Sequence, residues 1–204
     1  MATGAYERSL ENSSESITAI ILSWLAIEAF LNEAIEQATI HSESVENPSF
    51  KEKVVTMVSV IHELDNRASP DTKAKIMHRI LTGKALDTNS EQYEHFALLR
   101  RIRNALIHKK PETTTGLLDP EAPHAKLVKR LVQIKVIDEP PSGSTVWEPY
   151  VCVPRVAAWA HNTAIEMIKL IIRLFAADAM LRFKVEMPVQ SQVKQSPITL
   201  PSAQ

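Results

Sequence analysis

The sequence predicts an all-α protein, an antiparallel bundle of four to five main helices with an irregular insertion before a long last helix. Apolar residues recur at intervals of three and four along several long segments, the spacing of one helix face. Turn-forming residues instead concentrate between residues 110 and 152. Hydrophobic residues make up 45% of the 204 residues and charged residues 23%, values typical of a globular protein. Short connections between helices favour antiparallel neighbours.

The first half of the chain predicts three helices. The first is expected over 14–40, after a cap at Asn12 or Ser13, because apolar residues at 17, 20, 24, 27, 31 and 35 share one face. A second is expected over 49–66, with Ser49 as a cap. A third, shorter helix is expected to start at Ser69-Pro70 and to end near Gly83.

The second half predicts two helices separated by the insertion. A helix capped by Asn89 is expected to run to about residue 109, because the residue before Pro111 avoids helical angles. Within the insertion, HAKLVKRLVQIKVI reads as a helix passing into a strand, and TVWEPYVCV as its partner in a small β-hairpin. The last helix is expected over 153–183. Residues 1–13 are expected to be a flexible N-terminus, 14–184 a single domain and 185–204 a disordered tail.

Composition excludes several classes of function. The formal net charge of −1 does not indicate a nucleic-acid binder, so such an activity needs a local basic patch. The four glycines form no phosphate-binding loop, and the single Cys152 excludes an internal disulfide and a cysteine-rich zinc site. The apolar stretch ITAIILSWLAIEAFL is shorter than a membrane span and contains Glu28. We therefore expect a cytoplasmic protein with no cofactor, metal or membrane partner.

The stretch RRIRNALIHKK, residues 100–110, is the strongest candidate site. On a helix, Arg100, Arg103, Asn104 and His108 fall across the half opposite the apolar side chains, and Asn104 and His108, four residues apart, stack directly. Arg103 is not a direct neighbour of His108, but its side chain is long enough to reach round. Histidine exchanges protons near neutral pH, and arginine binds phosphate oxygens as a planar fork. This set suits RNA cleavage, in which a base activates the 2′-OH and a cation stabilises the charged transition state. The alternative is a helix end whose basic residues complement the helix dipole.

Glu28 is the second candidate, because it interrupts the apolar stripe of the first helix. A buried carboxylate is costly unless it is paired, and Arg103 or His108 is a natural partner. Glu28 could then orient either residue. The alternatives are a structural ion pair between two helices, or a residue at a wet edge. The histidines elsewhere in the chain have no metal-ligand spacing and are interpreted as surface or core residues.

Arg103-Asn104-Ala-Leu-Ile-His108 resembles the RNxxxH form of the motif of HEPN domains (higher eukaryotes and prokaryotes nucleotide-binding). The pattern Glu28-Ala-Phe-Leu-Asn32 in the first long helix is similar too. The resemblance covers roughly residues 14–184. It implies an all-α homodimer with a composite cleft, metal-independent endoribonuclease activity and a role as a toxin or in antiviral defence. Arg103 and His108 would be the catalytic pair, assisted by Asn104 and Glu28.

The resemblance also implies partners. RNA would be the substrate, with Arg100, Lys109 and Lys110 guiding its phosphates, and a cognate antitoxin or regulatory protein would control the activity. Some members of the family are not catalytic. The alternative function is therefore a module that binds nucleotide, RNA or a protein partner without chemistry.

Overall fold

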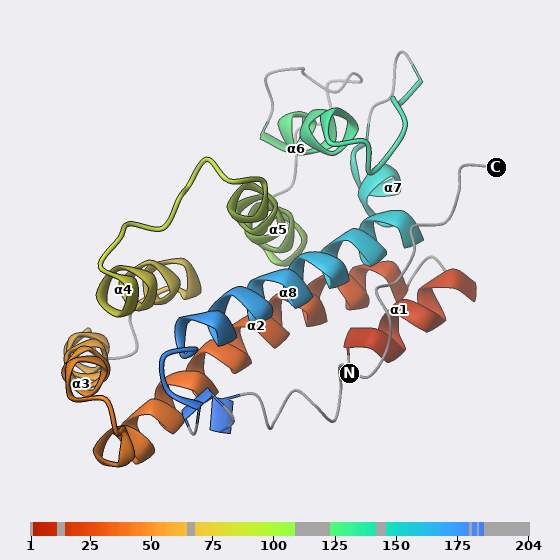
Figure 1. Ribbon diagram of the computed structural model, residues 1–204. Helices are drawn as coiled ribbons and strands as arrows, with labels where there is room; N and C mark the ends of the chain where they lie inside the picture. The colour runs from red at the N-terminus through yellow and green to blue at the C-terminus, as the bar shows by residue number, and fades with distance from the viewer. Residues whose placement is uncertain are drawn as a thin grey trace. The chain divides into compact units, whose positions relative to one another are not determined.

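The part of the chain that the structure describes is all α-helical, as the sequence predicts. The computed structural model describes residues 2–11, 15–64, 68–108, 123–141, 146–179, 181–182 and 184–185. These residues form α-helices and one short 3₁₀ helix, and they contain no β-strand (Figure 1). In chain order the elements are α1 (Ala2–Glu11), α2 (Glu15–His41), η1 (Ser42–Ser44), α3 (Pro48–Glu63), α4 (Pro70–Thr82), α5 (Glu91–Ile107), α6 (Pro123–Gln133), α7 (Glu148–Val151) and α8 (Pro154–Leu174).

The chain divides into two compact units, each assembled from separate stretches of sequence. Unit 1 comprises Met1–Leu25, His95–Ala164 and Ile198–Gln204, and unit 2 comprises Ala26–Glu94 and Ile165–Pro197. The divisions fall within α2, α5 and α8, so these three helices contribute residues to both units. The single domain expected over 14–184 therefore stays a prediction.

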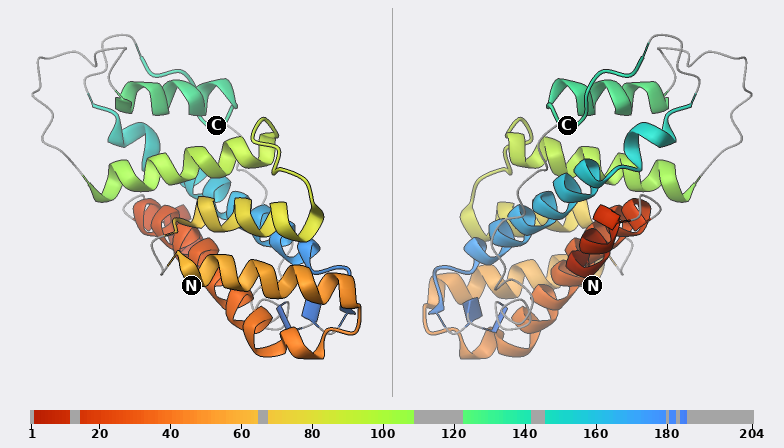
Figure 2. Two further views of the ribbon diagram at one scale, coloured as in Figure 1. Left: turned by 90° about the vertical axis from the view of Figure 1, so that its left-hand side faces the viewer. Right: turned by 90° about the vertical axis from the view of Figure 1, so that its right-hand side faces the viewer.

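The directions of the helices follow the lengths of their connections. In unit 2, α3 and α4 are joined by a short connection and pack antiparallel (Figure 2). By contrast, α8 runs in the same direction as α2 (Figures 1 and 2). Several elements separate α2 from α8 in the chain, so no short loop forces this pair to be antiparallel.

The N-terminus differs from its prediction, because residues expected to be flexible form α1. The side chain of Ala5 is fully buried in a cluster of small residues within unit 1, together with Ala19, Ala157 and Ala158. Arg8 Nε lies 3.5 Å from Glu15 Oε2, which links α1 to the start of α2. The polar composition of this segment gave no indication that Ala5 is buried. The predicted caps Asn12 and Ser13 lie outside the described residues.

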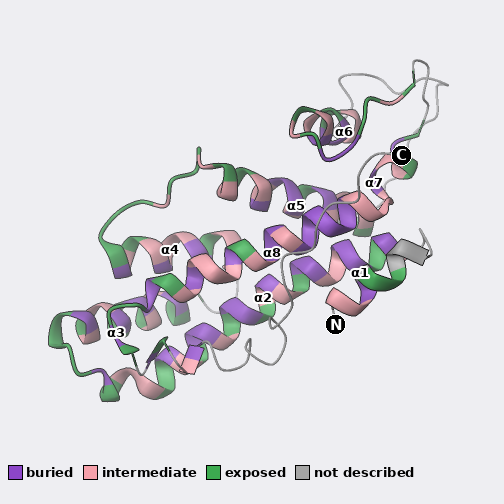
Figure 3. Cartoon of the chain, turned by 45° about the vertical axis from the view of Figure 1, so that its right-hand side comes forward, coloured by how far each residue is buried: buried purple, intermediate pink, exposed green. Residues whose placement is uncertain are grey.

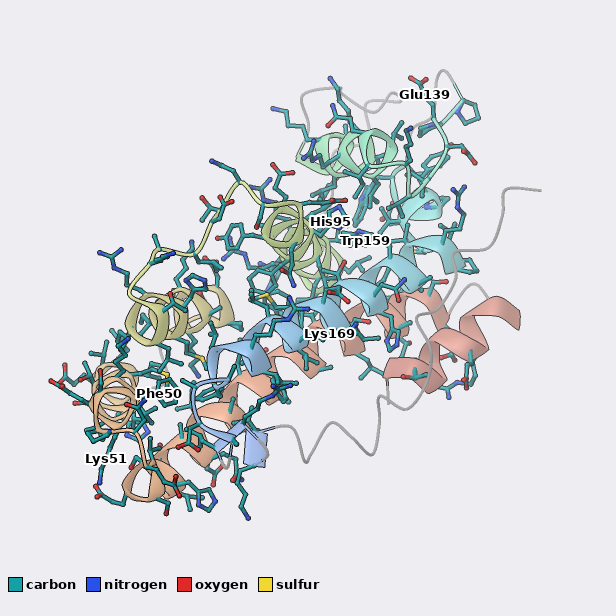
Figure 4. All side chains as sticks on the ribbon, in the orientation of Figure 1. Phe50, Lys51, His95, Glu139, Trp159 and Lys169 are labelled. Carbon is teal, nitrogen blue, oxygen red and sulfur yellow. The ribbon has the colours of Figure 1, made fainter. Side chains whose placement is uncertain are left out.

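Aromatic rings fix the core of unit 1. The rings of Trp24 and Phe96 stack with their centroids 5.2 Å apart, and both side chains are buried. The ring of His95 meets Trp159 edge-on, with centroids 5.9 Å apart (Figure 4). Aromatic pairs in these geometries add stabilisation beyond their buried area. These contacts join α2 to α5 and α5 to α8 inside unit 1.

Polar side chains hold α4 in unit 2. Lys73 is buried and donates from Nζ to Asn32 Oδ1 at 2.7 Å. The hydroxyl of Tyr93 donates to Asp71 Oδ1 at 2.6 Å, and Asp71 Oδ2 accepts from Lys75 Nζ at 3.1 Å. Hydrogen bonds with Tyr93 and Asp71 raise the pKa of the Lys75 ammonium above its usual value. Asn32, Asp71 and Tyr93 thus have structural partners in this unit.

The boundaries of α3 and α4 test the predicted caps. Ser69 caps α4 as predicted, and Gly83 ends it with a left-handed φ of 75°. The prediction of Ser49 as the cap of α3 is wrong, because Asn47 Oδ1 accepts the N–H of Phe50. Pro48 then occupies the first turn, where its missing N–H costs nothing.

The predicted β-hairpin is wrong in the described residues of the insertion. The expected helix forms as α6, but residues 134–137 are turns and bends instead of a strand. The expected partner strand contains α7, with Pro149 in its first turn. Proline fits a helix start and removes a hydrogen-bond donor that a strand would need. The buried Trp147 and Val151 are anchored by this short helix.

The last helix is shorter than the predicted 153–183, because α8 ends at Leu174. After a turn, Asp178 Oδ1 accepts the N–H of Leu181 at 2.9 Å, and Asp178 Oδ2 accepts the N–H of Glu46 at 3.3 Å. An aspartate that caps a new helical turn competes with continuation of the old one. A disordered tail was predicted for residues 185–204, and the residues after Val185 lie outside the described part of the chain.

The apolar character of α2 reflects its place in the core. By length and composition alone, the 30 residues Glu15–Ser44 could cross a membrane, since an 18-residue window within them has a mean hydropathy of 1.5. Of this window, 44% is buried inside the protein. Figure 3 shows buried residues recurring along α2. The cytoplasmic location stays a prediction.

His161, on the buried side of α8, makes stability depend on pH. Its side chain is 8% exposed, and burial lowers its pKa below the usual value. Below pH 6.5 the unfolded chain protonates this histidine while the folded chain does not. Stability should therefore fall as the pH drops from about 6.5 towards the folded-state pKa.

Urea unfolding of the wild type and of His161→Gln at several pH values between 8 and 5 measures this effect. We expect the variant to lose less stability on acidification than the wild type. Comparison at pH 8, where both histidine states are neutral, separates the packing change from the titration. Parallel pH curves for the two proteins would contradict a titrating His161.

Candidate functional site

The register of α5 decides which of its side chains reach the surface. Ser90 precedes the helix, and its Oγ accepts the N–H of Tyr93 at 3.4 Å, so the predicted cap Asn89 is wrong by one residue. The buried side chains of α5 are Phe96, Leu98, Leu99 and Ile102. They occupy one side of the helix at about 100° per residue. The other side is left for the candidate residues.

The exposed side of α5 carries polar and basic groups. Arg101, Asn104 and His108 are exposed, and Arg100 is half-buried with contacts of its own. The N–H of His108 donates to Asn104 O at 2.9 Å, so the two residues lie one turn apart as predicted. Ile107 is 43% exposed beside them. Ile107 therefore adds a small exposed apolar surface to this otherwise polar side of the helix.

Arg103 lies between the two sides of α5. Its side chain is half-buried, and its Nη1 donates to Asn104 Oδ1 at 3.1 Å. Its Nε is buried and has no hydrogen-bond partner among the described residues. The sequence placed Arg103 across the outer half of the helix, whereas the structure places it at the border. Asn104 is the common contact, through its side chain to Arg103 and through its backbone to His108.

The electrostatics around this site favour anions. Residues 95–108 include three arginines and contain no aspartate or glutamate. A carboxylate near a guanidinium would neutralise it, and none is present in this stretch to do so. The C-terminal end of a helix also favours a cation such as protonated histidine. Such a surface can hold phosphate oxygens through arginine and exchange protons through an exposed imidazole.

Glu28 is not among these residues. It belongs to unit 2, whereas Arg103, Asn104 and His108 belong to unit 1, so its predicted link to them stays a prediction. Its side chain is half-exposed and has no ion-pair partner among the described residues of its own unit. The alternative of a residue at a wet edge describes this position. Asn32, one turn later, is hydrogen-bonded to Lys73.

The other candidate residues are two lysines after α5 and the histidines elsewhere in the chain. Lys109 and Lys110 lie outside the described residues. His95 contacts Trp159, and His78 Nδ1 lies 2.9 Å from Lys84 O, which agrees with surface or core roles. Within the described ranges, no three His, Cys, Asp or Glu side chains group closely enough to hold a metal ion.

One basic residue was missed by the sequence reasoning. Arg101 is exposed on the same side of α5 as His108, and the helical projection that found Asn104 would have found it. Lys135 belongs to a basic stretch with Lys126, Lys129 and Arg130, which the sequence reads as a solvated face or as a contact to a nucleic-acid backbone. Its positive φ of 58° is not indicated by any residue pattern. A comparison with known protein families, curated proteins and solved structures finds no match for this chain.

The buried Nε of Arg103, unpaired among the described residues, allows a structural role of this residue to be distinguished from a functional one. A buried donor without a partner costs about 1–3 kcal/mol, so an apolar side chain of similar length removes a cost. We expect Arg103→Met to leave the free energy of unfolding unchanged or to raise it by about 1 kcal/mol. Urea denaturation of wild type and variant checks this expectation.

A loss of more than about 3 kcal/mol in Arg103→Met would contradict it, because such losses follow when a buried ion pair is broken. Arg173→Met serves as the control, since Arg173 is exposed near the end of α8. Its stability should stay within about 0.5 kcal/mol of the wild type, as for surface substitutions in general.

Proposed function

We propose that this protein is an endoribonuclease of the HEPN type, which cuts RNA through Arg103 and His108. The observation that carries the proposal is the double role of Asn104. It hydrogen-bonds the Arg103 guanidinium and, through its carbonyl oxygen, the backbone of His108. The arrangement places a phosphate-binding cation and an exposed imidazole about one and a half helical turns apart on the same helix.

The proposed reaction needs no metal ion. Neutral His108 removes the proton of a ribose 2′-OH, and the oxygen attacks the adjacent phosphorus. Arg103 stabilises the extra negative charge on the phosphate oxygens as the transition state forms. The bond from phosphorus to the 5′-oxygen breaks, which leaves a 2′,3′-cyclic phosphate and a 5′-hydroxyl. The departing 5′-oxygen takes up a proton from an acid.

A homodimer completes this scheme. One chain offers one His108, whereas the reaction uses a base for the 2′-OH and an acid for the leaving oxygen. A second copy would supply the second imidazole across a composite cleft. The exposed Ile107 supports this arrangement, because a partner on this face of α5 would cover an apolar side chain that is now in water.

The biological role follows from the same resemblance. An RNA-cutting protein of this family would act as a toxin or in antiviral defence, in the cytoplasm, under the control of an antitoxin or regulatory protein. Glu28 could assist by orienting the catalytic pair, and Lys109 and Lys110 by guiding phosphates.

The second candidate is a module that binds RNA, nucleotide or a protein partner without chemistry. The three arginines of residues 95–108, a stretch with no aspartate or glutamate, support binding by themselves and do not require His108. The two candidates differ in one respect, because only the ribonuclease depends on a proton-transferring group.

Replacement of His108 tests the ribonuclease. We expect the purified protein to cut single-stranded RNA in EDTA, and His108→Ala to lower the rate by about 10²–10⁴, the usual contribution of a general acid or base. His62→Ala is the matched control, since His62 is exposed in the last turn of α3. The rate and the RNA end groups are measured on denaturing gels and by mass spectrometry.

His62→Ala should retain the wild-type rate, and the products should carry 2′,3′-cyclic phosphate ends. Equal cleavage by wild type and His108→Ala on several RNAs would exclude His108 from the chemistry. RNA binding without any cleavage would instead support the non-catalytic module.

A further inference from the structure

A second basic surface lies close to the candidate site. Residues 95–108 and 123–137, at α5 and α6, contain seven lysine and arginine residues and no aspartate or glutamate. Both stretches belong to unit 1, and α6 runs alongside α5 in Figures 1 and 2. Unit 1 contains 11 basic and 9 acidic residues, whereas unit 2 contains 12 basic and 15 acidic ones. The nearly neutral net charge of the chain therefore hides a local excess of positive charge.

Helix α6 separates its basic face clearly from its apolar face. Leu127, Val128 and Leu131 are buried, while Lys126 and Lys129 are exposed. At 100° per residue, Lys126, Lys129 and Arg130 project from the side of the helix opposite Leu131. A basic amphipathic helix can bind a membrane surface only if its apolar face is available to lipid. Here that face is buried within the protein, which leaves the basic face as the accessible one.

Lys135 stands where the backbone favours glycine. The N–H of Val136 donates to Leu131 O and that of Lys135 to Val132 O, both at 2.9 Å. This pair of bonds is the Schellman motif, which places its left-handed residue at Lys135. The equivalent position after α4 is Gly83. A lysine in this conformation is strained, and strained residues cluster at functional sites.

Three of the basic residues are exposed without an ion-pair partner in the described part of unit 1. These are Arg101 on α5, Lys129 on α6 and Lys135 after α6. Unit 2 also carries exposed cations without an ion-pair partner among its described residues, namely Arg79, Lys84 and Arg173, whereas Lys51 pairs with Glu43 and Lys169 with Glu166. Unit 1 differs from unit 2 in its charge balance, because residues 95–108 and 123–137 contain no carboxylate and Asp138, which follows them, is paired with Arg155. A local excess of accessible cations is the footprint of a polyanion-binding surface.

We infer that Arg101, Lys129 and Lys135 form a track that binds the phosphate backbone of single-stranded RNA next to the candidate site. This inference rests on the proposed function for its choice of RNA as the polyanion. The track holds the strand by charge and reads no sequence, because backbone contacts position a nucleic acid without specifying bases. It supplies affinity to a site whose Arg103 and His108 contact only the reacting phosphate.

The test measures binding separately from cleavage. A fluorescent 2′-O-methyl oligoribonucleotide cannot be cut by 2′-OH attack, so its anisotropy reports affinity for the full-length protein. The triple variant Arg101→Gln, Lys129→Gln, Lys135→Gly should bind on the order of tenfold more weakly. Its plot of log affinity against log salt should be shallower by about 2, since each phosphate contact on a single strand contributes about 0.7.

A matched variant removes the same number of charges from unit 2. Arg79→Gln, Lys84→Gln, Arg173→Gln replaces three exposed residues and should bind as the wild type does. The single change Lys135→Gly should raise Tm by about 2–4 °C, because it relieves the left-handed strain, and should still weaken RNA binding. A purely structural Lys135 would give the rise in Tm with unchanged affinity.

Equal binding by the two triple variants would overturn the track. A loss in the track variant that appears equally with polyglutamate would overturn RNA as the partner and favour an acidic protein. Cleavage of ordinary RNA, measured in parallel, keeps this outcome apart from the proposed function. If the track variant binds weakly while His108→Ala leaves the processing of RNA unchanged, the track stands and the ribonuclease fails.

Discussion

The helical register of α5 is the constraint on which the candidate site depends. Phe96, Leu99 and Ile102 are fully buried, and Phe96 stacks on Trp24. Rotating the helix would bring these side chains into water at a cost of about 1.5–3 kcal/mol each. The same register therefore exposes Asn104 and His108 and holds Arg103 at the border. The core of unit 1 thus places the residues to which we assign chemistry.

Local patterns predicted the helices, and tertiary contacts decided where prediction failed. The spacing of apolar residues located α2 to within about a residue at each end. Ser69 and Gly83 mark the two ends of α4, because each makes its capping hydrogen bond to a residue only three or four positions away. The prediction of a β-hairpin failed because Trp147 and Val151 are buried by the short helix α7 instead of by a strand. The prediction of a continuous last helix failed near Asp178, whose Oδ2 accepts the backbone N–H of Glu46, a residue far away in the sequence.

The candidate site was predictable to the same extent. The four-residue spacing of Asn104 and His108 follows from helix geometry and is observed. The hydrogen bond from Arg103 to Asn104 depends on side-chain rotamers, which a sequence does not specify. Glu28 was read as the centre of an apolar stripe, yet the buried residues of α2 leave it at the edge. The strain at Lys135 is visible only in the backbone.

Cleavage of an RNA with one altered sugar tests the proposed chemistry most directly. The preferred cleavage position in an oligoribonucleotide is first mapped, and the ribose on its 5′ side is then replaced by 2′-deoxyribose. If His108 activates the 2′-OH, the altered RNA should bind with similar affinity and remain uncut at that position, while other positions are still cleaved. Cleavage of the altered linkage at the original rate would contradict 2′-OH attack and the roles assigned to Arg103 and His108.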